Sequence, residues 1–180
     1  KRNGDGERSA LRLLFSVLCA GVRRGRIKRR GVPRGGDMEY AKAGGVIVAR
    51  LEVGEEIVDS VRAIARRENV VFAEVSGIGA VKEFDVSVYD VSAKRYYDNS
   101  YAEPMELTSL LGTVTRKDGE PYVHLHATAG GGDGRAYGGH LKRAVIGATC
   151  ELVLRTADIA VGRKTDEVTG LNVFDFTEVL

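Results

Sequence analysis

The pattern of hydrophobic and polar positions becomes regular near residue 45, where it predicts a strand followed by a helix. Positions 46–51 form a short apolar run that ends before a glycine, as a buried strand does. In the segment 55–67, apolar residues then recur every three or four positions. Two glutamates open this segment and two arginines close it, which complements the dipole of a helix. The segment is therefore predicted to be an amphipathic helix.

Beyond residue 69 the hydrophobic period shortens to two, which is the period of β-strands. Phe84, Val86 and Val88 alternate with polar residues and predict a strand with one buried face. A tight turn is predicted at Ser76–Gly79, and Asp118-Gly119 carries the signal of a hairpin turn. The remaining predicted strands lie at 70–75, 95–101, 106–114, 122–127, 144–155 and 171–176.

Consecutive strands joined by short turns favour an antiparallel sheet. One or two helices packed on such a sheet give the α+β class rather than a doubly wound α/β fold. With 180 residues and 43% hydrophobic content, the chain is long enough for one ordinary domain with a core.

The formal net charge of +2 conceals two unequal parts. Residues 1–37 hold 11 of the 27 Lys+Arg and 3 of the 25 Asp+Glu, so they carry +8, whereas residues 38–180 carry −6. We interpret residues 1–37 as a basic, mostly disordered leader with a short helix at Leu11–Ala20, and residues 38–180 as the domain. An alternative is that Met38 is the natural start and that the leader is upstream sequence.

The sequence indicates neither a membrane segment nor oxidising chemistry. The apolar stretch 13–21 is too short to span a bilayer, and the basic cluster after it disfavours a secretory signal. Cys19 and Cys150 have no metal or redox spacing, which predicts a reduced, cytoplasmic setting.

The candidate chemistry lies in the three histidines, which fall within 17 positions. On a strand, His124 and His126 point the same way while Leu125 faces the core. The glycine-rich segment 130–139 allows a tight fold-back that returns His140 to this pair. Three neutral imidazoles around a tetrahedral ion leave one position open, as in a catalytic or ligand-binding zinc site. The opposing interpretation is that the histidines only line an exposed sheet face and a loop.

Two charged residues are candidates for a supporting role near the histidines. Glu151 is a candidate to orient a ligand or move a proton, and Arg135 is a candidate to bind an anion. The glycine spacing matches no phosphate-binding motif. No catalytic residue is assigned, because Ser76 does not lie in a nucleophile elbow and Cys150 lies in a strand-like apolar run. Alternating tyrosines between 89 and 101 are expected to cover a sheet edge or an oligomer interface.

Seven motifs, in order, resemble the plants-and-prokaryotes conserved (PPC) domain over about residues 45–176. The resemblance is to the stand-alone prokaryotic type, which is related to the C-terminal domain of plant AT-hook nuclear-localized proteins. The motifs are Gly54-Glu55-Glu56-Ile57, Ser76-Gly77-Ile78-Gly79-Ala80, Glu106-Leu107-Thr108-Ser109-Leu110-Leu111-Gly112, Asp118-Gly119-Glu120-Pro121, His124-Leu125-His126, Gly138-Gly139-His140-Leu141 and Cys150-Glu151-Leu152-Val153-Leu154.

The resemblance implies a PPC-like α+β fold assembled as a homotrimer. It also implies that His124, His126 and His140 correspond to the histidines that hold zinc in prokaryotic members. Stand-alone relatives are usually called DNA-binding, because plant members join the domain to an AT-hook. In the leader, Arg23–Arg30 contains Arg-Gly-Arg, but Ile27 stands where an AT-hook has proline.

Two functions therefore stay open. The first is a homotrimeric, zinc-binding, DNA-associated or transcription-associated module, against which the −6 charge of the domain argues. The alternative is a metal-dependent enzyme or small-ligand-binding protein, in which a zinc ion on the three histidines polarises a carbonyl or activates water. A structural assembly module that metal only stabilises is a third interpretation.

Overall fold

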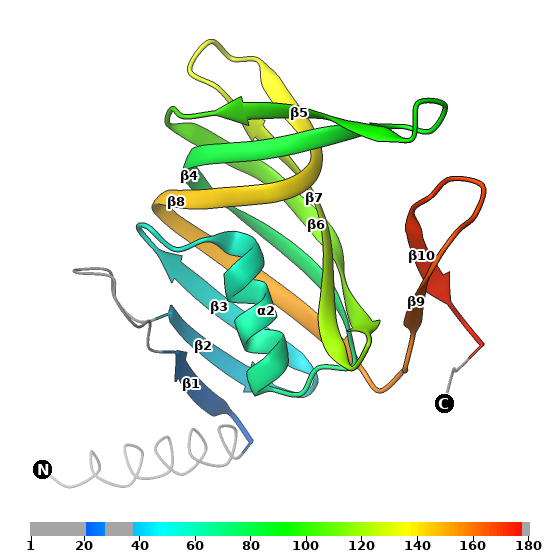
Figure 1. Cartoon of the computed structure of the whole chain (residues 1–180). Coiled ribbons are helices and arrows are strands. Elements are labelled where there is room, and N and C mark those ends of the chain that lie inside the picture. The colour runs from blue at the N-terminus through cyan, green and yellow to red at the C-terminus, as the bar shows by residue number, and fades with distance from the viewer. Residues whose placement is uncertain (1–20, 28–37, 178–180) are drawn as a thin grey trace, which may run out of the picture.

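The computed structural model describes residues 21–27 and 38–177, which form a strongly curved sheet around one helix (Figure 1). Every strand pairing in this described part is antiparallel, so the predicted α+β class is confirmed. The elements in chain order are β1 (Arg23–Ile27), β2 (Met38–Ala43), β3 (Val46–Glu52), α2 (Ile57–Arg67), β4 (Phe72–Asp90), β5 (Arg95–Tyr101), β6 (Met105–Lys117), β7 (Glu120–Gly130), β8 (Ala136–Ala157), β9 (Gly162–Thr165) and β10 (Asn172–Asp175).

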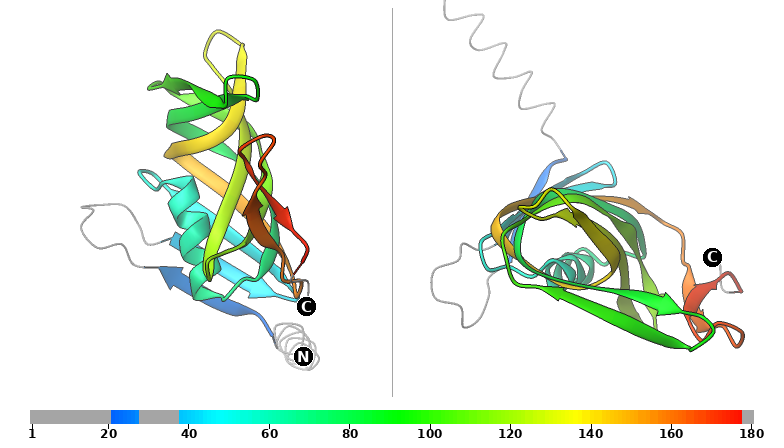
Figure 2. Two further views of the ribbon diagram at one scale, coloured as in Figure 1. Left: turned by 45° about the vertical axis from the view of Figure 1, so that its right-hand side comes forward. Right: turned by 90° about the horizontal axis from the view of Figure 1, so that it is seen from above.

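The main sheet closes on itself. Its strand order is β1-β2-β3-β8-β7-β6-β4-β5, and β4 also pairs with β8, so β4, β6, β7 and β8 form a hydrogen-bonded ring. Seen from above, this ring surrounds the axis of α2 (Figure 2). Closure depends on two long strands, β4 with 19 residues and β8 with 22. The first half of β8 pairs with β7 and β4, and its second half pairs with β3 and β4.

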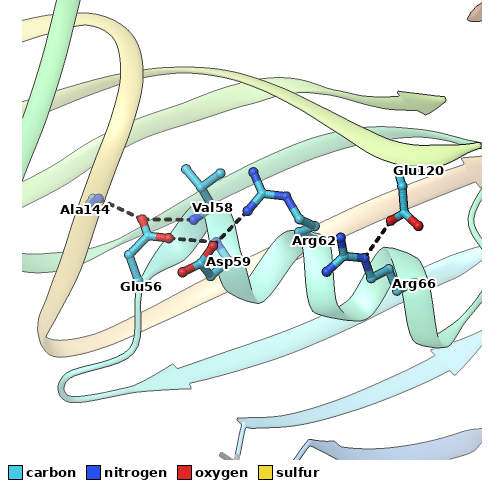
Figure 3. A network of polar contacts seen from close by, with 7 residues as sticks. All are labelled: Glu56, Val58, Asp59, Arg62, Arg66, Glu120 and Ala144. Atoms are coloured by element: carbon cyan, nitrogen blue, oxygen red, sulfur yellow. Dashed lines mark hydrogen bonds and ion pairs between the residues drawn. The ribbon is translucent and has the colours of Figure 1, made fainter. Parts of the chain in front are cut away.

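The helix α2 is held to two strands by charged side chains (Figure 3). The Glu56 carboxylate caps the helix by accepting the N–H groups of Val58 and Asp59 at 3.1 and 2.7 Å. The same carboxylate accepts the N–H of Ala144 on β8 at 3.0 Å. In the last turn, Arg66 pairs with Glu120 of β7 at 2.9 Å. The predicted helix is therefore confirmed, and its two ends are fixed on the strands that carry the histidines.

One hydrophobic core fills the space between α2 and the sheet. Ile57, Val61 and Ile64 of the helix are fully buried, and they belong to the same buried cluster as Phe84 and Leu125 of the strands. None of the described residues forms a helix with the length and hydrophobicity that crossing a bilayer requires.

The predicted turn at Ser76–Gly79 is wrong, because β4 continues through this segment with a bulge between Gly77 and Gly79. A Cβ atom on Gly79 would lie 2.5 Å from the carbonyl oxygen of Thr149 on β8. The glycine therefore serves the close approach of two strands rather than a turn.

Several strand boundaries also differ from the predictions. β8 begins at residue 136 rather than 144, so that the glycines at 138 and 139 and His140 lie within the strand. β2 and β9 were not predicted, because they are short and only weakly alternating. Residues 23–27 form β1 against β2, which differs from the leader interpretation. The predicted helix at Leu11–Ala20 lies outside the described residues.

Candidate metal centre

The structure brings the three histidines together on the outer face of the ring. His124 and His126 lie on β7, and His140 lies directly opposite His126 in the β7–β8 ladder. Their ring centroids are separated by 5.1 to 5.6 Å, and one nitrogen of each lies within 4.8 Å of the others. The fold-back expected of residues 130–139 is achieved by a turn at 131–135 followed by strand pairing.

A cavity of about 690 Å³ opens over these imidazoles. One wall comes from the end of β4 and the start of β5, and the other comes from the loop between β9 and β10. The hairpin of β9 and β10 stands beside β6 (Figures 1 and 2). The lining residues other than the histidines are Ser87, Val88, Tyr89, Lys94, Tyr96, Tyr122, Gly139, Gly170, Leu171 and Asn172.

The surroundings keep two of the imidazoles neutral. Burial is the main cause that lowers the pKa of His124 from 6.5 to about 4, and electrostatic interactions with His140, Arg163 and His126 add to it. Burial also lowers the pKa of His140, with smaller contributions from His126 and Lys142. Both side chains are therefore unprotonated at neutral pH, which is the form that binds a metal ion.

Arg163 of β9 is a charged neighbour that the sequence did not reveal. Its guanidinium donates to the hydroxyls of Thr115 and Thr113 at 2.9 and 3.2 Å and to the carbonyl oxygen of Asn172 at 3.3 Å. It also stacks on the ring of Tyr122, with 4.8 Å between the guanidinium carbon and the ring centroid. The sequence holds no signal for this residue, because the contact depends on how a short hairpin packs against β6.

Ser87 lies beneath the cavity. It is directly opposite His140 in the β4–β8 ladder and is only 1% exposed. Its hydroxyl is buried and has no hydrogen-bond partner among the described residues. A buried hydroxyl without a partner costs about 1–3 kcal/mol, so this group calls for a functional explanation.

Two sequence predictions are corrected here, because neither Glu151 nor Arg135 lines the cavity. Glu151 is exposed and lies opposite Arg50 and Ile78. It is eleven positions beyond His140 on an extended strand, a displacement on the order of 30 Å along the chain. The Arg135 side chain is 79% exposed in the β7–β8 turn and pairs with Asp133 at 3.6 Å.

The tyrosines and the cysteine have distinct environments. Tyr89 and Tyr96 line the cavity and stack with their ring centroids 4.8 Å apart, so they do more than cover an edge. Cys150 is fully buried, and burial raises the pKa of its thiol to about 12. The prediction that Cys150 belongs to the strand core is confirmed.

The chemistry of the donor set fits a transition-metal ion such as zinc, copper, iron or nickel. Three imidazole nitrogens converge, and no carboxylate or thiolate from the described residues joins the cluster. These three imidazoles would hold a borderline divalent ion, and such an ion could take a further ligand from the neighbouring cavity. Calcium and magnesium require oxygen ligands, which this cluster does not supply.

Comparison with known proteins gives one family and several solved structures. A family model described as the Plants and Prokaryotes Conserved (PCC) domain matches residues 38–158. A comparison with curated proteins finds no match.

Three crystal structures illustrate the similarity. A "putative DNA-binding protein" from Bacteroides thetaiotaomicron is 29% identical with a TM-score of 0.75, covering 77% of this chain and 97% of its own. A metal-containing protein from Archaeoglobus fulgidus is 34% identical with a TM-score of 0.69, covering 74% and 95%. A plant- and prokaryote-conserved (PPC) protein from Pyrococcus horikoshii is 25% identical with a TM-score of 0.69, covering 82% and 99%.

Proposed function

Because the chain belongs to the Plants and Prokaryotes Conserved (PCC) domain family, we propose that it is a homotrimeric, cytoplasmic, zinc-binding member whose metal centre holds a small ligand. The ligands of the ion are His124, His126 and His140. The observation that carries the proposal is the convergence of these imidazoles, two of them kept neutral, at one cavity of about 690 Å³. The similarity to a metal-containing protein from Archaeoglobus fulgidus supports it.

A zinc ion in such a site polarises a bound carbonyl or lowers the pKa of a bound water. The residues of the chain itself would orient the ligands. We assign Ser87 as a positioning residue for His140, because it lies opposite that histidine and its buried, uncommitted hydroxyl is placed to form a hydrogen bond to the ring once the ring binds a metal. Groups of this kind fix the ring of a metal-binding histidine, and their loss typically lowers metal affinity about 10- to 100-fold.

Elemental analysis of the purified protein tests the metal assignment. We expect one zinc per chain, and none in the His126→Ala variant. Thr128→Ala is a matched control, because Thr128 lies two positions further along the same face of β7 but outside the histidine cluster. Circular dichroism of both variants should match the parent. An unchanged zinc content in His126→Ala would refute the assignment.

Self-association, which a homotrimer requires, is supported by an apolar band on the outer face of the sheet. Val48, Ile78 and Leu111 are each more than half exposed, on β3, β4 and β6. The strand register aligns Val48 with Val153, Val153 with Ser76 and Ser76 with Leu111. An exposed apolar band of this kind marks a protein interface. Sedimentation analysis should give a trimer for the parent and a smaller species for Leu111→Glu.

DNA association is the second candidate, and the observation in its favour is the similarity to a "putative DNA-binding protein". Residues 38–180 carry 16 Lys+Arg against 22 Asp+Glu, so counterion release gives this part little affinity for a duplex. Arg23–Ile27 pairs with β2 as a strand, so the backbone of this segment is already engaged in the sheet. Duplex binding across a salt series, with the full chain and with a chain starting at Met38, tests this candidate. Binding that needs residues 1–37 would exclude the domain as the DNA-binding part.

A further inference from the structure

The cavity over the histidines is positively charged and has no acidic wall. Lys94 is the one residue with a full charge in its lining, and no lining residue is an aspartate or glutamate. Lys94 lies in the β4–β5 turn, and its amine donates a hydrogen bond to the carbonyl oxygen of Glu167 at 3.3 Å. This bond links the β4–β5 wall of the cavity to the loop between β9 and β10. A divalent ion on the imidazoles would add two more positive charges.

Arg163, which lies behind the cavity wall, strengthens the positive electrostatic potential of the cavity. Its guanidinium is half-buried, and burial lowers its pKa. All three hydrogen bonds given above go to neutral oxygens, and no carboxylate of the described residues forms an ion pair with it. A half-buried cation without an anionic partner is costly, since it has lost part of its hydration. An anion in the neighbouring cavity would offset that cost.

The other charged groups near the site lie outside the cavity lining. Lys142, beside Tyr96 and His140, is bound by both carboxylate oxygens of Asp98 at 2.7 and 2.8 Å. Asp166, which is close enough to Lys94 for that charge to help lower its pKa, accepts two hydrogen bonds from Thr169 and does not line the cavity. The positive charge at the cavity therefore comes from Lys94 and Arg163, and from the metal when it is bound, while the Asp166 carboxylate offsets part of the Lys94 charge from outside the lining.

Two phenols provide hydrogen-bond donors in the same wall. The hydroxyl oxygen of Tyr122 accepts a hydrogen bond from the Asn172 amide at 3.3 Å. The hydroxyl proton of Tyr122 is therefore not used in that bond and can be donated to a ligand. Burial and the neighbouring tyrosines raise the pKa of Tyr96, so that its hydroxyl keeps its proton. The rings of these tyrosines, together with Val88 and Leu171, form the apolar part of the cavity wall.

We infer that this cavity binds a small carboxylate with a flat apolar body, whose charge faces the metal and Lys94 and whose body lies against the tyrosine rings. This inference rests on the proposed metal-dependent ligand binding and names its ligand class. A phosphate fits less well, because the described residues that line the cavity include no helix N-terminus and no arginine.

Isothermal titration of the zinc-loaded full chain with a matched set of probes tests the inference. Benzoate, benzamide and benzamidine share one ring and differ in charge, and inorganic phosphate tests the competing anion. We expect benzoate to bind on the order of tenfold more tightly than benzamide, because a charged hydrogen-bonding group is recognised more strongly than a neutral one. Benzamidine and phosphate should bind more weakly than benzoate. Equal affinities for benzoate and benzamide, or tighter binding of phosphate, would overturn the inference.

A pair of charge variants separates local recognition from general attraction. Lys94→Gln should lower benzoate affinity about fivefold and leave benzamide unchanged, as expected for one partly exposed charge. Lys164→Gln removes the same charge from β9, where Lys164 pairs with Asp175 at 3.4 Å outside the cavity. This control should bind benzoate like the parent. Equal losses in the two variants would count against a site at Lys94.

The same titration on chelator-treated protein distinguishes the inference from the proposed function. Without metal, benzoate should bind more weakly but still more tightly than benzamide, because Lys94 and Arg163 remain. Stoichiometric zinc without any preference for benzoate would refute the inference alone. A preference for benzoate in a protein that takes up no zinc even when zinc is added would refute the proposed metal centre alone.

Discussion

A single added methyl group on β6 should disrupt the metal centre, because Gly112 lies where β6 and β7 come closest. It is opposite Leu125, between the two histidines of β7. A Cβ atom on Gly112 would lie 2.0 Å from the carbonyl oxygen of His124 and 2.8 Å from the Cα of Leu125. Both neighbours are backbone atoms, so the clash cannot be relieved by rotating a side chain.

The size of the effect follows from the overlap. An ordinary contact at this position is 3.4 to 4 Å, so the two strands must separate by more than 1 Å. Overpacking of this kind costs roughly 1–3 kcal/mol, and each ladder hydrogen bond that is lost adds about 1 kcal/mol. We therefore expect Gly112→Ala to lower the free energy of unfolding by about 3 kcal/mol, a large share of the stability of an ordinary domain. It should also weaken zinc binding, because His124 moves with its carbonyl.

Urea unfolding at one fixed protein concentration, combined with zinc titration, measures both effects. Gly130→Ala is the matched control, since it lies on the paired strand β7 and its Cβ would meet nothing nearer than the Glu106 carbonyl oxygen at 4.0 Å. Its unfolding free energy should change by less than about 0.5 kcal/mol. If Gly112→Ala were as stable as this control and bound zinc like the parent, the steric argument would be wrong.

Three further predictions concern the histidines, the core thiol and the helix cap. The pKa of His124 is about 4 in the folded protein against 6.5 unfolded, so the metal-free protein should lose stability as the pH falls from 6.5 towards 4 and be insensitive to this group above that range. At pH 5 this shift corresponds to a loss of about 2 kcal/mol in the free energy of unfolding, which solvent screening at this half-exposed site reduces to about 1 kcal/mol. Urea unfolding at pH 7.5 and 5.0 measures the loss. Between these two pH values, the unfolding free energy of His124→Gln should fall by about 1 kcal/mol less than that of the parent. Since burial raises the pKa of Cys150 to about 12, peptide mapping should find it unalkylated in the native protein and alkylated in urea; labelling of the native protein would contradict its burial. Glu56→Ala removes an acceptor for two N–H groups of α2 and one of β8, so it should lower the unfolding free energy by about 2 kcal/mol, against less than about 0.5 kcal/mol for Asp59→Ala.

Local patterns predicted the parts of the molecule that depend on local physics. The helix at 57–67 follows from its period and from the acidic residues before it, and the His-x-His pair follows from strand alternation. Both signals lie within a dozen residues, which is the range over which periodicity is informative.

The walls of the cavity could not be predicted in this way. Arg163 reaches Thr115 across 48 positions, and Ser87 meets His140 through the β4–β8 ladder. Gly79 was misassigned to a turn, because the reason for the glycine is a strand that arrives 70 positions later. Glu151 was placed near the histidines because nothing in the sequence shows that β8 stays extended for 22 residues.

The β7–β8 hairpin has a consequence for how the chain acquires its metal. All three imidazoles belong to this one hairpin, and its turn closes a loop of only 13 residues between His126 and His140. Closing so short a loop costs little chain entropy, whereas the β4–β8 pairing that completes the ring joins segments more than 50 positions apart. If the proposed metal centre exists, a partly folded chain would already be able to bind the ion, and binding to that state would reduce the stability that the metal adds to the finished fold. We would then expect metal loading to begin before the ring of strands is complete.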